Sequence, residues 1–350
     1  MEKNDIIIIH GTDYKNMAKR VLEQAGVAAD IGDVNKKIAL KPNLVTAKAP
    51  SSGATTHSEL LAGVIEYLRE HGFQNITIME GSWVGDHTED AFQAAGYHQV
   101  CSRYSVPFVD LQRDTWKEYD AAGMKIKLCD KAAAVDYMIN MPVLKGHCQT
   151  TVTCALKNNK GVIPNSEKRR FHTLGLHKPI AHLNTIARSD FILVDNICGD
   201  LDFEEGGNPV VMNRVLGFKD PVLCDAFVCD CMGYSVDDVP YITMAEKLGV
   251  GSTDTAHANM IYLNQATEAD SKFRMTRRVQ HLAAYTAPED ACSACYGSLI
   301  YALDRLNDMG VSEEGPASCM HRPGLQGAGW RHRRGTMYLL LCQNPGRLSP

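Results

Sequence analysis

Polar side chains that could bind or activate a ligand follow four predicted strands of this sequence. They come in pairs directly after apolar runs: Lys41 and Asn43, Glu80 and Ser82, Lys145 and His147, Asp195 and Asp200. In open α/β sheets, ligands bind beyond the carboxyl ends of the strands, where neighbouring loops converge. We therefore expect these side chains to line one crevice. The alternative is that polar residues simply begin every loop of an α/β protein.

Positive charge gathers after the third of these strands, although the chain as a whole is acidic. The 350 residues hold 36 Lys and Arg against 41 Asp and Glu, a formal charge of −5. The basic residues and histidines of the segment are Lys145, His147, Lys157, Lys160, Lys168, Arg169, Arg170, His172, His177 and Lys178. This cluster favours an anionic ligand, a carboxylate or a phosphate. Gly146 and Gly161 would let the backbone approach it, whereas residues 168–170 fit equally well on a solvated helix face.

Histidines near Lys145 indicate proton transfer as a second chemistry. Neutral imidazole moves protons or binds metals near pH 7, and the spacing of His57, His147, His172 and His177 matches no common zinc motif. Lys145 with His147 or His57 would serve racemisation or isomerisation of a carboxylate substrate. No P-loop and no Gly-x-Gly-x-x-Gly is present, so a standard nucleotide site has no support.

The sequence Cys292-Ser293-Ala294-Cys295 is the sharpest local motif. Two thiolates at this spacing can hold one Zn²⁺ or one iron of an iron–sulfur cluster, and either centre needs further ligands. These would come from Cys319 and Cys342 or from another chain. A thioredoxin-like dithiol is the rival. The chain has twelve cysteines, and most of the others stand alone in apolar stretches, so we expect buried, structural side chains there.

Strand-like and helix-like patterns alternate along most of the chain. This predicts a doubly wound α/β fold with a mostly parallel sheet, helices on both faces and a small C-terminal cysteine-containing element. Strands are expected at 6–9, 37–40, 75–79, 135–141 and 191–194, and helices at 14–24, 60–68, 88–95, 224–232 and 242–248. Thr56 to Glu59 has capping-box spacing. The predicted domains are a core at 1–285, a C-x-x-C helix element at 286–311 and a tail at 312–350.

Composition excludes several classes of protein. No apolar run approaches the ~18–20 residues that span a bilayer, and the first residues are too acidic for a signal peptide. The negative charge argues against nucleic-acid binding. We expect a cytoplasmic protein with a small anionic ligand and neither nucleic acid nor membrane as a partner.

Taken in order, the motifs resemble those of the family known as domain of unknown function 362. They are Lys41-Pro42-Asn43-Leu44-Val45, Thr55-Thr56-His57-Ser58-Glu59-Leu60, Lys145-Gly146-His147, Leu156-Lys157-Asn158-Asn159-Lys160-Gly161, Asp195–Asp200 and Cys292–Tyr296. Members are often labelled uncharacterised iron–sulfur proteins. The resemblance implies the fold, an iron–sulfur centre of the 4Fe-4S type and an electron-transfer partner. Residues 41–80 are also similar to the N-terminal half of nickel-dependent lactate racemases.

The predicted site has catalytic, ligand-binding and metal residues. They are, in that order, Lys145, His147 and His57; Lys41, Asn43, Glu80, Lys157, Asn158, Lys160, His172 and Asp195; and Cys292 and Cys295. The leading function is an iron–sulfur-associated protein with an anion-binding crevice, in redox or ligand-transfer work. The alternatives are a metal-independent Lys/His proton-transfer enzyme and a zinc-stabilised binding module.

The tail after Ser312 departs from the pattern of the core. It carries five arginines against two acids, and prolines and glycines interrupt it throughout. Plausible codons read one nucleotide later spell a cysteine-rich ending like that of the family. We therefore predict a single-nucleotide shift near Ser312 and a disordered or out-of-frame tail at 312–350.

Overall fold

The computed structural model of the chain describes residues 1–206 and 208–265 and short stretches beyond them. These stretches are 281–282, 286–289, 299–300, 302–306, 317–320, 329–333 and 336–340. The chain divides into two compact units, Met1–Met275 and Thr276–Pro350. In the described residues, no helix is both long enough and apolar enough to cross a bilayer.

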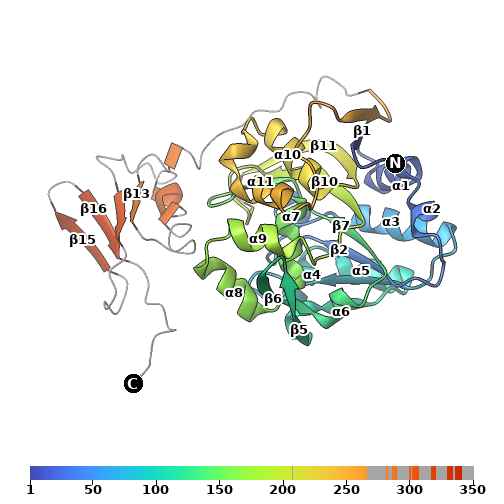
Figure 1. Cartoon of the computed structure of the whole chain (residues 1–350), viewed down its shortest axis with the longest axis horizontal. Coiled ribbons are helices and arrows are strands. Elements are labelled where there is room, and N and C mark those ends of the chain that lie inside the picture. Colours follow the sequence, from blue (N-terminus) through green and yellow to red (C-terminus); the bar gives the residue numbers. More distant parts are fainter. Residues whose placement is uncertain are drawn as a thin grey trace. The chain divides into compact units, whose positions relative to one another are not determined.

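The first unit is built on an eight-stranded, mostly parallel sheet (Figure 1). The order is β12-β1-β11-β10-β7-β2-β3-β4. The strands are β1 (Asp5–His10), β2 (Ile38–Pro42), β3 (Ile76–Glu80), β4 (Phe108–Asp110), β7 (Tyr137–Met141), β10 (Phe191–Asp200), β11 (Pro209–Phe218) and β12 (Asn259–Tyr262). Only β11 runs against its neighbours, β1 and β10. The carboxyl ends of the other strands therefore share one edge.

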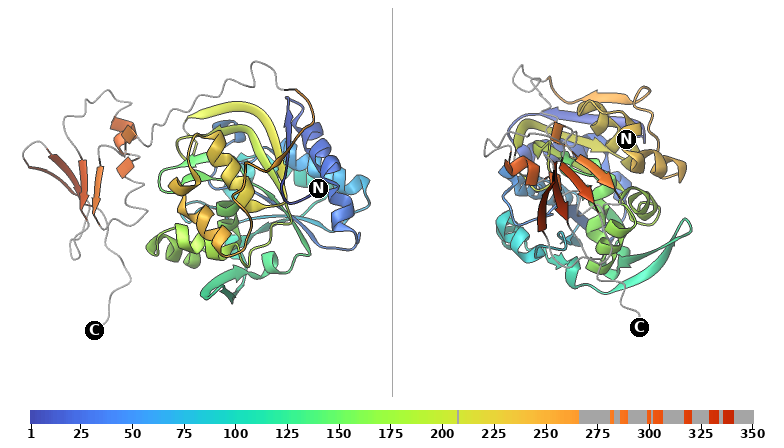
Figure 2. Two further views of the ribbon diagram at one scale, coloured as in Figure 1. Left: turned by 45° about the horizontal axis from the view of Figure 1, so that its top comes forward. Right: turned by 90° about the vertical axis from the view of Figure 1, so that its left-hand side faces the viewer.

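Helices cover both faces of this sheet, which confirms the predicted doubly wound α/β fold (Figure 2). Successive residues of a strand point to opposite faces, so Ile7 and Ile9 of β1 pack in one core and Ile6 and Ile8 in the other. The first core includes α1 (Tyr14–Ala25), α2 (Val27–Ile31), α3 (Ser58–Glu70), α4 (Thr88–Ala94) and α5 (Tyr97–Tyr104). The second includes α6 (Asp130–Ala133), α7 (Ala155–Asn158), α8 (Asn165–Thr173), α9 (His177–Leu183), α10 (Pro221–Cys231) and α11 (Pro240–Lys247).

Two short ribbons extend the first unit beyond the sheet. One pairs β5 (Trp116–Ala121) with β6 (Met124–Cys129), and the other pairs β8 (Lys145–His147) with β9 (Thr151–Thr153). The β8–β9 ribbon leaves the carboxyl end of β7, so it carries Lys145 and His147 to the edge where the polar side chains were expected.

The second unit contains a four-stranded sheet ordered β13-β14-β16-β15. Its strands are β13 (Thr286–Glu289), β14 (Ala317–Met320), β15 (Gly329–Arg333) and β16 (Thr336–Leu340). Cys292, Cys295 and Cys342 lie outside the described residues, and Cys319 is described only as part of the backbone of β14. The predicted cysteine element and the predicted frame shift therefore stay predictions.

The predicted capping box at the start of α3 is wrong. His57 is the N-cap residue, and its side chain makes no capping hydrogen bond. The Thr56 hydroxyl is engaged elsewhere: it accepts from the Asn43 N–H at 2.9 Å and donates to the Met141 carbonyl at 2.8 Å. The hydroxyl thus joins the loop that follows β2 to the last residue of β7, and site residues follow both strands.

The helix cap at Asp220 gives a test of the fold. Its carboxylate accepts from the N–H groups of Val222, Leu223 and Ser252 at 2.8–3.0 Å, whereas exposed Asp13 caps α1 through Asn16 alone, at 3.2 Å. We expect Asp220→Ala to lower the free energy of unfolding by about 2 kcal/mol and Asp13→Ala by roughly a quarter of that. Urea denaturation followed by circular dichroism measures both. Equal losses would contradict this account of the cap.

Candidate functional site

The carboxyl edge of the sheet brings most of the predicted polar residues into one connected set. Lys41 and Glu80 lie near the ends of β2 and β3, and Lys145 and His147 form β8 beyond β7. Lys157 and Asn158 end α7, which follows the ribbon. Asp195 lies within β10 rather than after it, because that strand continues to Asp200.

Lys41 and Glu80 form a buried ion pair at 2.7 Å between Nζ and Oε2. Their side chains are 0% and 3% exposed. Burial lowers the pKa of Lys41, and Glu80 acts against that shift. Gly161 is in contact with both, and a Cβ there would collide with the Glu80 carboxylate. Glycine is therefore required at 161 for close packing against the pair. The expected approach of Gly161 to a ligand stays a prediction.

Lys168 is a second buried lysine on this side of the sheet. Its Nζ donates to the carbonyl oxygens of Gly81 and Ser82, each at 2.8 Å, and burial lowers its pKa to about 8. It fixes the loop after β3 directly behind Glu80. Of the basic run at 168–170, Lys168 is buried, Arg170 is partly exposed and Arg169 is exposed to solvent.

A chain of asparagine amides connects the strand ends to Lys145. Asn158 Nδ2 donates to Asn140 Oδ1 at 2.7 Å, and Asn43 Nδ2 donates to Asn158 Oδ1 at 2.9 Å. Lys145 Nζ donates to Asn43 Oδ1 at 3.1 Å, to the Ala54 carbonyl at 2.7 Å and to the Glu204 carbonyl at 3.1 Å. The three ammonium protons of Lys145 are thereby engaged, although burial lowers its pKa to about 8.

The centre of the site is a carboxylate surrounded by cationic and imidazole groups. Glu204 Oε1 lies 2.5 Å from Lys157 Nζ, and Oε2 lies 3.0 Å from His147 Nε2. His147 Nδ1 accepts the N–H groups of Gln149 and Thr150, so the ring proton is on Nε2 and is donated to Glu204. Burial and Lys157 lower the pKa of His147 to about 4, which makes the ring neutral at pH 7. Burial acts to raise the pKa of Glu204, but Lys157 and His147 hold it well below its usual value.

Lys160 and His172 lie beside this centre. Their Nζ and Nε2 atoms are 3.4 Å apart. Burial and the positive charge of Lys157 lower the pKa of Lys160 to about 7. Burial and Lys160 lower the pKa of His172 to about 3. Near neutral pH, Lys160 is therefore divided between amine and ammonium forms, and the imidazole of His172 is neutral.

His57 and Asp195 form a separate pair. His57 Nδ1 lies 2.8 Å from Asp195 Oδ2, which also accepts the His57 backbone N–H at 2.7 Å. Burial disfavours the charged imidazole, but Asp195 outweighs burial and raises the pKa of His57. Lys145 binds the carbonyl of Ala54 in the loop that leads into His57. No direct contact joins His57 to the Glu204 centre among the described interactions.

Sequence reasoning missed Glu204, the residue on which the centre converges. Glu204-Glu205-Gly206-Gly207 was a signal for it, because an acidic pair beside two glycines is typical of a loop that approaches other backbone. His177, included among the histidines of interest, stacks on Tyr241 at 6.0 Å between ring centroids. Gly146 approaches the Leu201 carbonyl.

In the part of the chain that the structure describes, one group of side chains has the composition and spacing of metal ligands. It consists of Cys154, Cys224 and Asp225, with ligand atoms within 4.8 Å of one another. The Asp225 carboxylate already accepts the N–H groups of Ala155 and Leu156, and burial raises the pKa of both thiols. Two thiols are too few for a 4Fe-4S cluster, which takes four cysteines. Cys292 and Cys295 lie outside the described residues.

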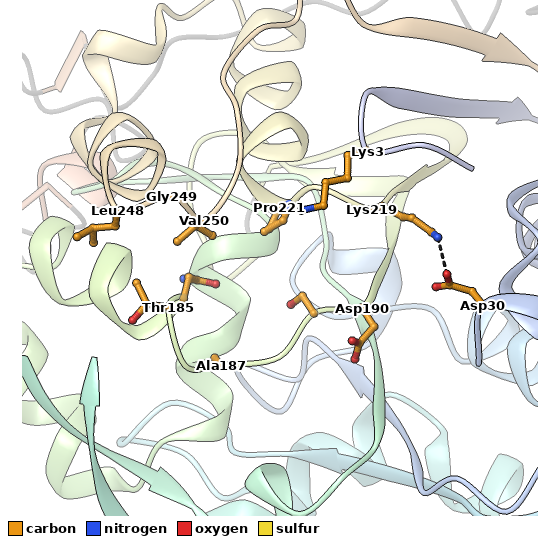
Figure 3. A pocket seen from close by; sticks show the side chains of 12 residues that line it. Lys3, Asp30, Thr185, Ala187, Asp190, Lys219, Pro221, Leu248, Gly249 and Val250 are labelled. Carbon is orange, nitrogen blue, oxygen red and sulfur yellow. Dashed lines mark hydrogen bonds and ion pairs between the residues drawn. The ribbon is translucent and has the colours of Figure 1, made fainter. Parts of the chain in front are cut away.

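A separate pocket of about 500 Å³ lies at the opposite, amino edge of the sheet (Figure 3). Lys3 precedes β1, Asp190 precedes β10 and Lys219 follows β11. Because β11 runs antiparallel to β1 and β10, these three residues lie at the same edge of the sheet. Lys219 is paired with Asp30 at 2.6 Å. None of the predicted site residues lines this pocket.

The chain belongs to the family described as domain of unknown function (DUF362), whose sequence profile matches residues 38–230. It is 22% identical over 246 residues to the thylakoid-associated protein sll1697 of Synechocystis sp. PCC 6803, covering 67% of this chain and 75% of that protein. The lactate racemase apoprotein of Thermoanaerobacterium thermosaccharolyticum aligns at 15% identity with a TM-score of 0.44, covering 66% of this chain and 58% of the racemase chain. At that TM-score the likeness says nothing about the reaction.

The buried Lys41–Glu80 pair gives a quantitative test of the site's construction. We expect Lys41→Met and Glu80→Gln each to lower the free energy of unfolding by about 3 kcal/mol, because each leaves a buried partner without its counterpart. The double variant should lose less than the sum, with a coupling of about 2 kcal/mol.

The exposed pair Lys19–Glu70 is the matched control, at 2.6 Å but with side chains 28% and 55% exposed. A surface pair contributes below about 1 kcal/mol, so Lys19→Met and Glu70→Gln should be nearly additive. Chemical denaturation measures both cycles. If the losses of unfolding free energy in Lys41→Met and Glu80→Gln are additive, the buried pair does not stabilise the site.

Proposed function

We propose that this chain is an enzyme that binds a small carboxylate and moves a proton at the carbon beside it. The observation that supports the proposal is the convergence of Lys157 and His147 on one carboxylate, that of Glu204. Lys145 donates to the backbone carbonyl of the same residue. Buried donors fixed in this way are strong ligands for an anion, since no water competes for them.

The donors of the centre would bind the substrate and stabilise the charge that develops on it. Lys157 and the Nε2–H group of His147 would hold the two oxygens of a substrate carboxylate. When the C–H bond beside that carboxylate breaks, its electron pair moves toward the same oxygens. Preorganised donors at these oxygens then stabilise the enediolate that forms. Lys145 adds positive charge through its fixed position between Asn43 and Ala54.

Lys160 is the best candidate for the base. Its pKa of about 7 provides a neutral amine at physiological pH, and a pKa near the working pH is optimal for proton transfer. Lys145, the base named from the sequence, donates all three of its protons and is better suited to holding charge. Return of the proton to the opposite side of the carbon would racemise the substrate, and return to another carbon would isomerise it.

Proton exchange with solvent tests this proposal. In D₂O, the enzyme should exchange the α-proton of one or more small 2-hydroxy or 2-amino acids, measured by proton NMR. The rate should rise with pH through about 7 as Lys160 loses its proton. Lys160→Arg keeps the charge but cannot accept a proton, so exchange should fall by about 100-fold or more.

Exposed Arg169 offers the control, since Arg169→Gln removes a charge from the same basic run without touching the centre. Its exchange rate should match that of the unchanged enzyme. Full exchange by the Lys160→Arg variant would contradict the assignment of the base.

An iron–sulfur role is a second candidate, and the Cys292–Cys295 spacing favours it. Such a centre would carry electrons to a partner protein, and a single zinc ion would instead make the C-terminal region a binding module. The cytoplasm is the proposed location for either function. The name thylakoid-associated belongs to the Synechocystis relative.

Metal analysis of anaerobically purified, full-length protein tests this candidate. Iron and sulfide in equal amounts, lost in Cys292→Ser and Cys295→Ser, are the expected result. Cys101→Ser, a change at a half-buried thiol in α5, should retain both. Zinc without sulfide would favour the binding module, and protein free of both metals would contradict each of these roles.

A further inference from the structure

The Glu204 carboxylate belongs to a loop, whereas its binding partners belong to the core. Residues 201–208 connect β10 to β11. Asp200 Oδ1 accepts the N–H groups of Asp202 and Phe203 at 3.0 and 2.9 Å, and Lys48 Nζ donates to the Gly206 carbonyl at 2.9 Å. The backbone is thus held on both sides of Glu204. The Glu204 carbonyl accepts from Lys145, and the side chain extends to Lys157 and His147.

The donors around that carboxylate are also held by contacts outside the loop. Lys157 is in α7, whose N-terminal N–H groups are capped by buried Asp225. His147 is held by two backbone N–H groups that donate to its Nδ1 atom. The exposed fractions differ in the same sense: 3% for Lys157, 7% for His147 and 20% for Glu204. The carboxylate is the most accessible member of the centre.

We propose that the Glu204 carboxylate occupies the subsite of a ligand carboxylate, and that a ligand binds by displacing it. The two groups that exchange, the Glu204 carboxylate and a ligand carboxylate, have the same charge and the same geometry. A ligand carboxylate takes over the same two donors, the charge of the centre stays constant, and no buried lysine is left without an anion. Rotation about the three side-chain bonds of Glu204 suffices, so the loop need not open.

The proposal rests on the anion-binding part of the proposed function and extends it to substrate choice. A ligand that displaces Glu204 must present a planar carboxylate with two acceptor oxygens and be short enough to fit where a carboxyethyl side chain lay. This defines small monocarboxylates as the class. Glu204 competes with the ligand for the subsite. The apparent affinity for the ligand is therefore the intrinsic affinity multiplied by the fraction of molecules in which the subsite is free.

Glycolate binding to the full chain, measured by isothermal titration calorimetry, tests the displacement. If the subsite is free in roughly 1–10% of molecules, Glu204→Gln should bind glycolate about 10- to 100-fold more tightly than the unchanged protein. Glu205→Gln removes the same charge from the next residue, also on this loop, and should leave the affinity within about twofold of the unchanged protein. Lys157→Met should bind glycolate weakly or not at all.

A second variant guards against a failure of Glu204→Gln to fold. Glu204→Ala leaves a gap in front of Lys157, and acetate should raise its melting temperature more than that of the unchanged protein. Equal glycolate affinity in Glu204→Gln and the unchanged protein, or no selective effect of acetate on Glu204→Ala, overturns the displacement. If Lys157→Met binds glycolate normally, the anion-binding function itself fails, whatever the result at position 204.

Discussion

The structure of this site depends on the burial of lysine ammonium groups. Moving an ammonium ion out of water costs several kcal/mol even after relaxation, and four lysines in this region are nearly or fully buried: Lys41, Lys145, Lys157 and Lys168. The acceptors that compensate each buried charge differ. Lys41 and Lys157 each have a carboxylate, that of Glu80 or Glu204. Lys168 has two carbonyl oxygens, and Lys145 has an amide oxygen and two carbonyl oxygens. The loops at the carboxyl edge are shaped by these requirements, because their carbonyl groups must face the amines.

The uneven compensation separates the chemical roles of the lysines. Lys160 is close to Lys157, and no carboxylate of the described residues forms an ion pair with it, so burial and like charge lower its pKa to about 7. Where compensation is complete, as at Lys41, the amine is a structural cation. Pairs of groups whose environments push their pKa values apart are typical of acid–base sites. The charges and acceptors around each amine, rather than burial alone, therefore distinguish Lys145, which holds charge, from the candidate base Lys160 within sixteen residues of sequence.

The sequence was sufficient to predict the layers of the fold and the edge that carries the polar residues. Ile6–Ile9 and the other apolar runs indicated strands buried on both faces, and the polar residues after them indicated loops at one edge. Antiparallel β11 and the full length of β10 were not predicted, because apolar periodicity gives neither strand direction nor the continuation of a strand through Asp195 and Asp200. Glu204 lies in the connection between β10 and β11, so it was missed together with these two strands. The chain of Asn140, Asn158 and Asn43 was also beyond prediction, since amides meet only after the strands are ordered.

The anion site and the cysteine motif occupy different parts of the sequence. Every hydrogen bond and ion pair described for the Glu204 centre joins residues between Asn43 and Glu204, all within the 38–230 region that matches the family. Cys292 and Cys295 lie beyond that region and in the second unit. Among the described residues, the donors are positioned by β8, by α7 and by the asparagine chain, which all belong to the first unit. A change of reading frame near Ser312 would leave the identity of these residues unchanged, because they all precede that position, whereas Cys319 and Cys342 follow it.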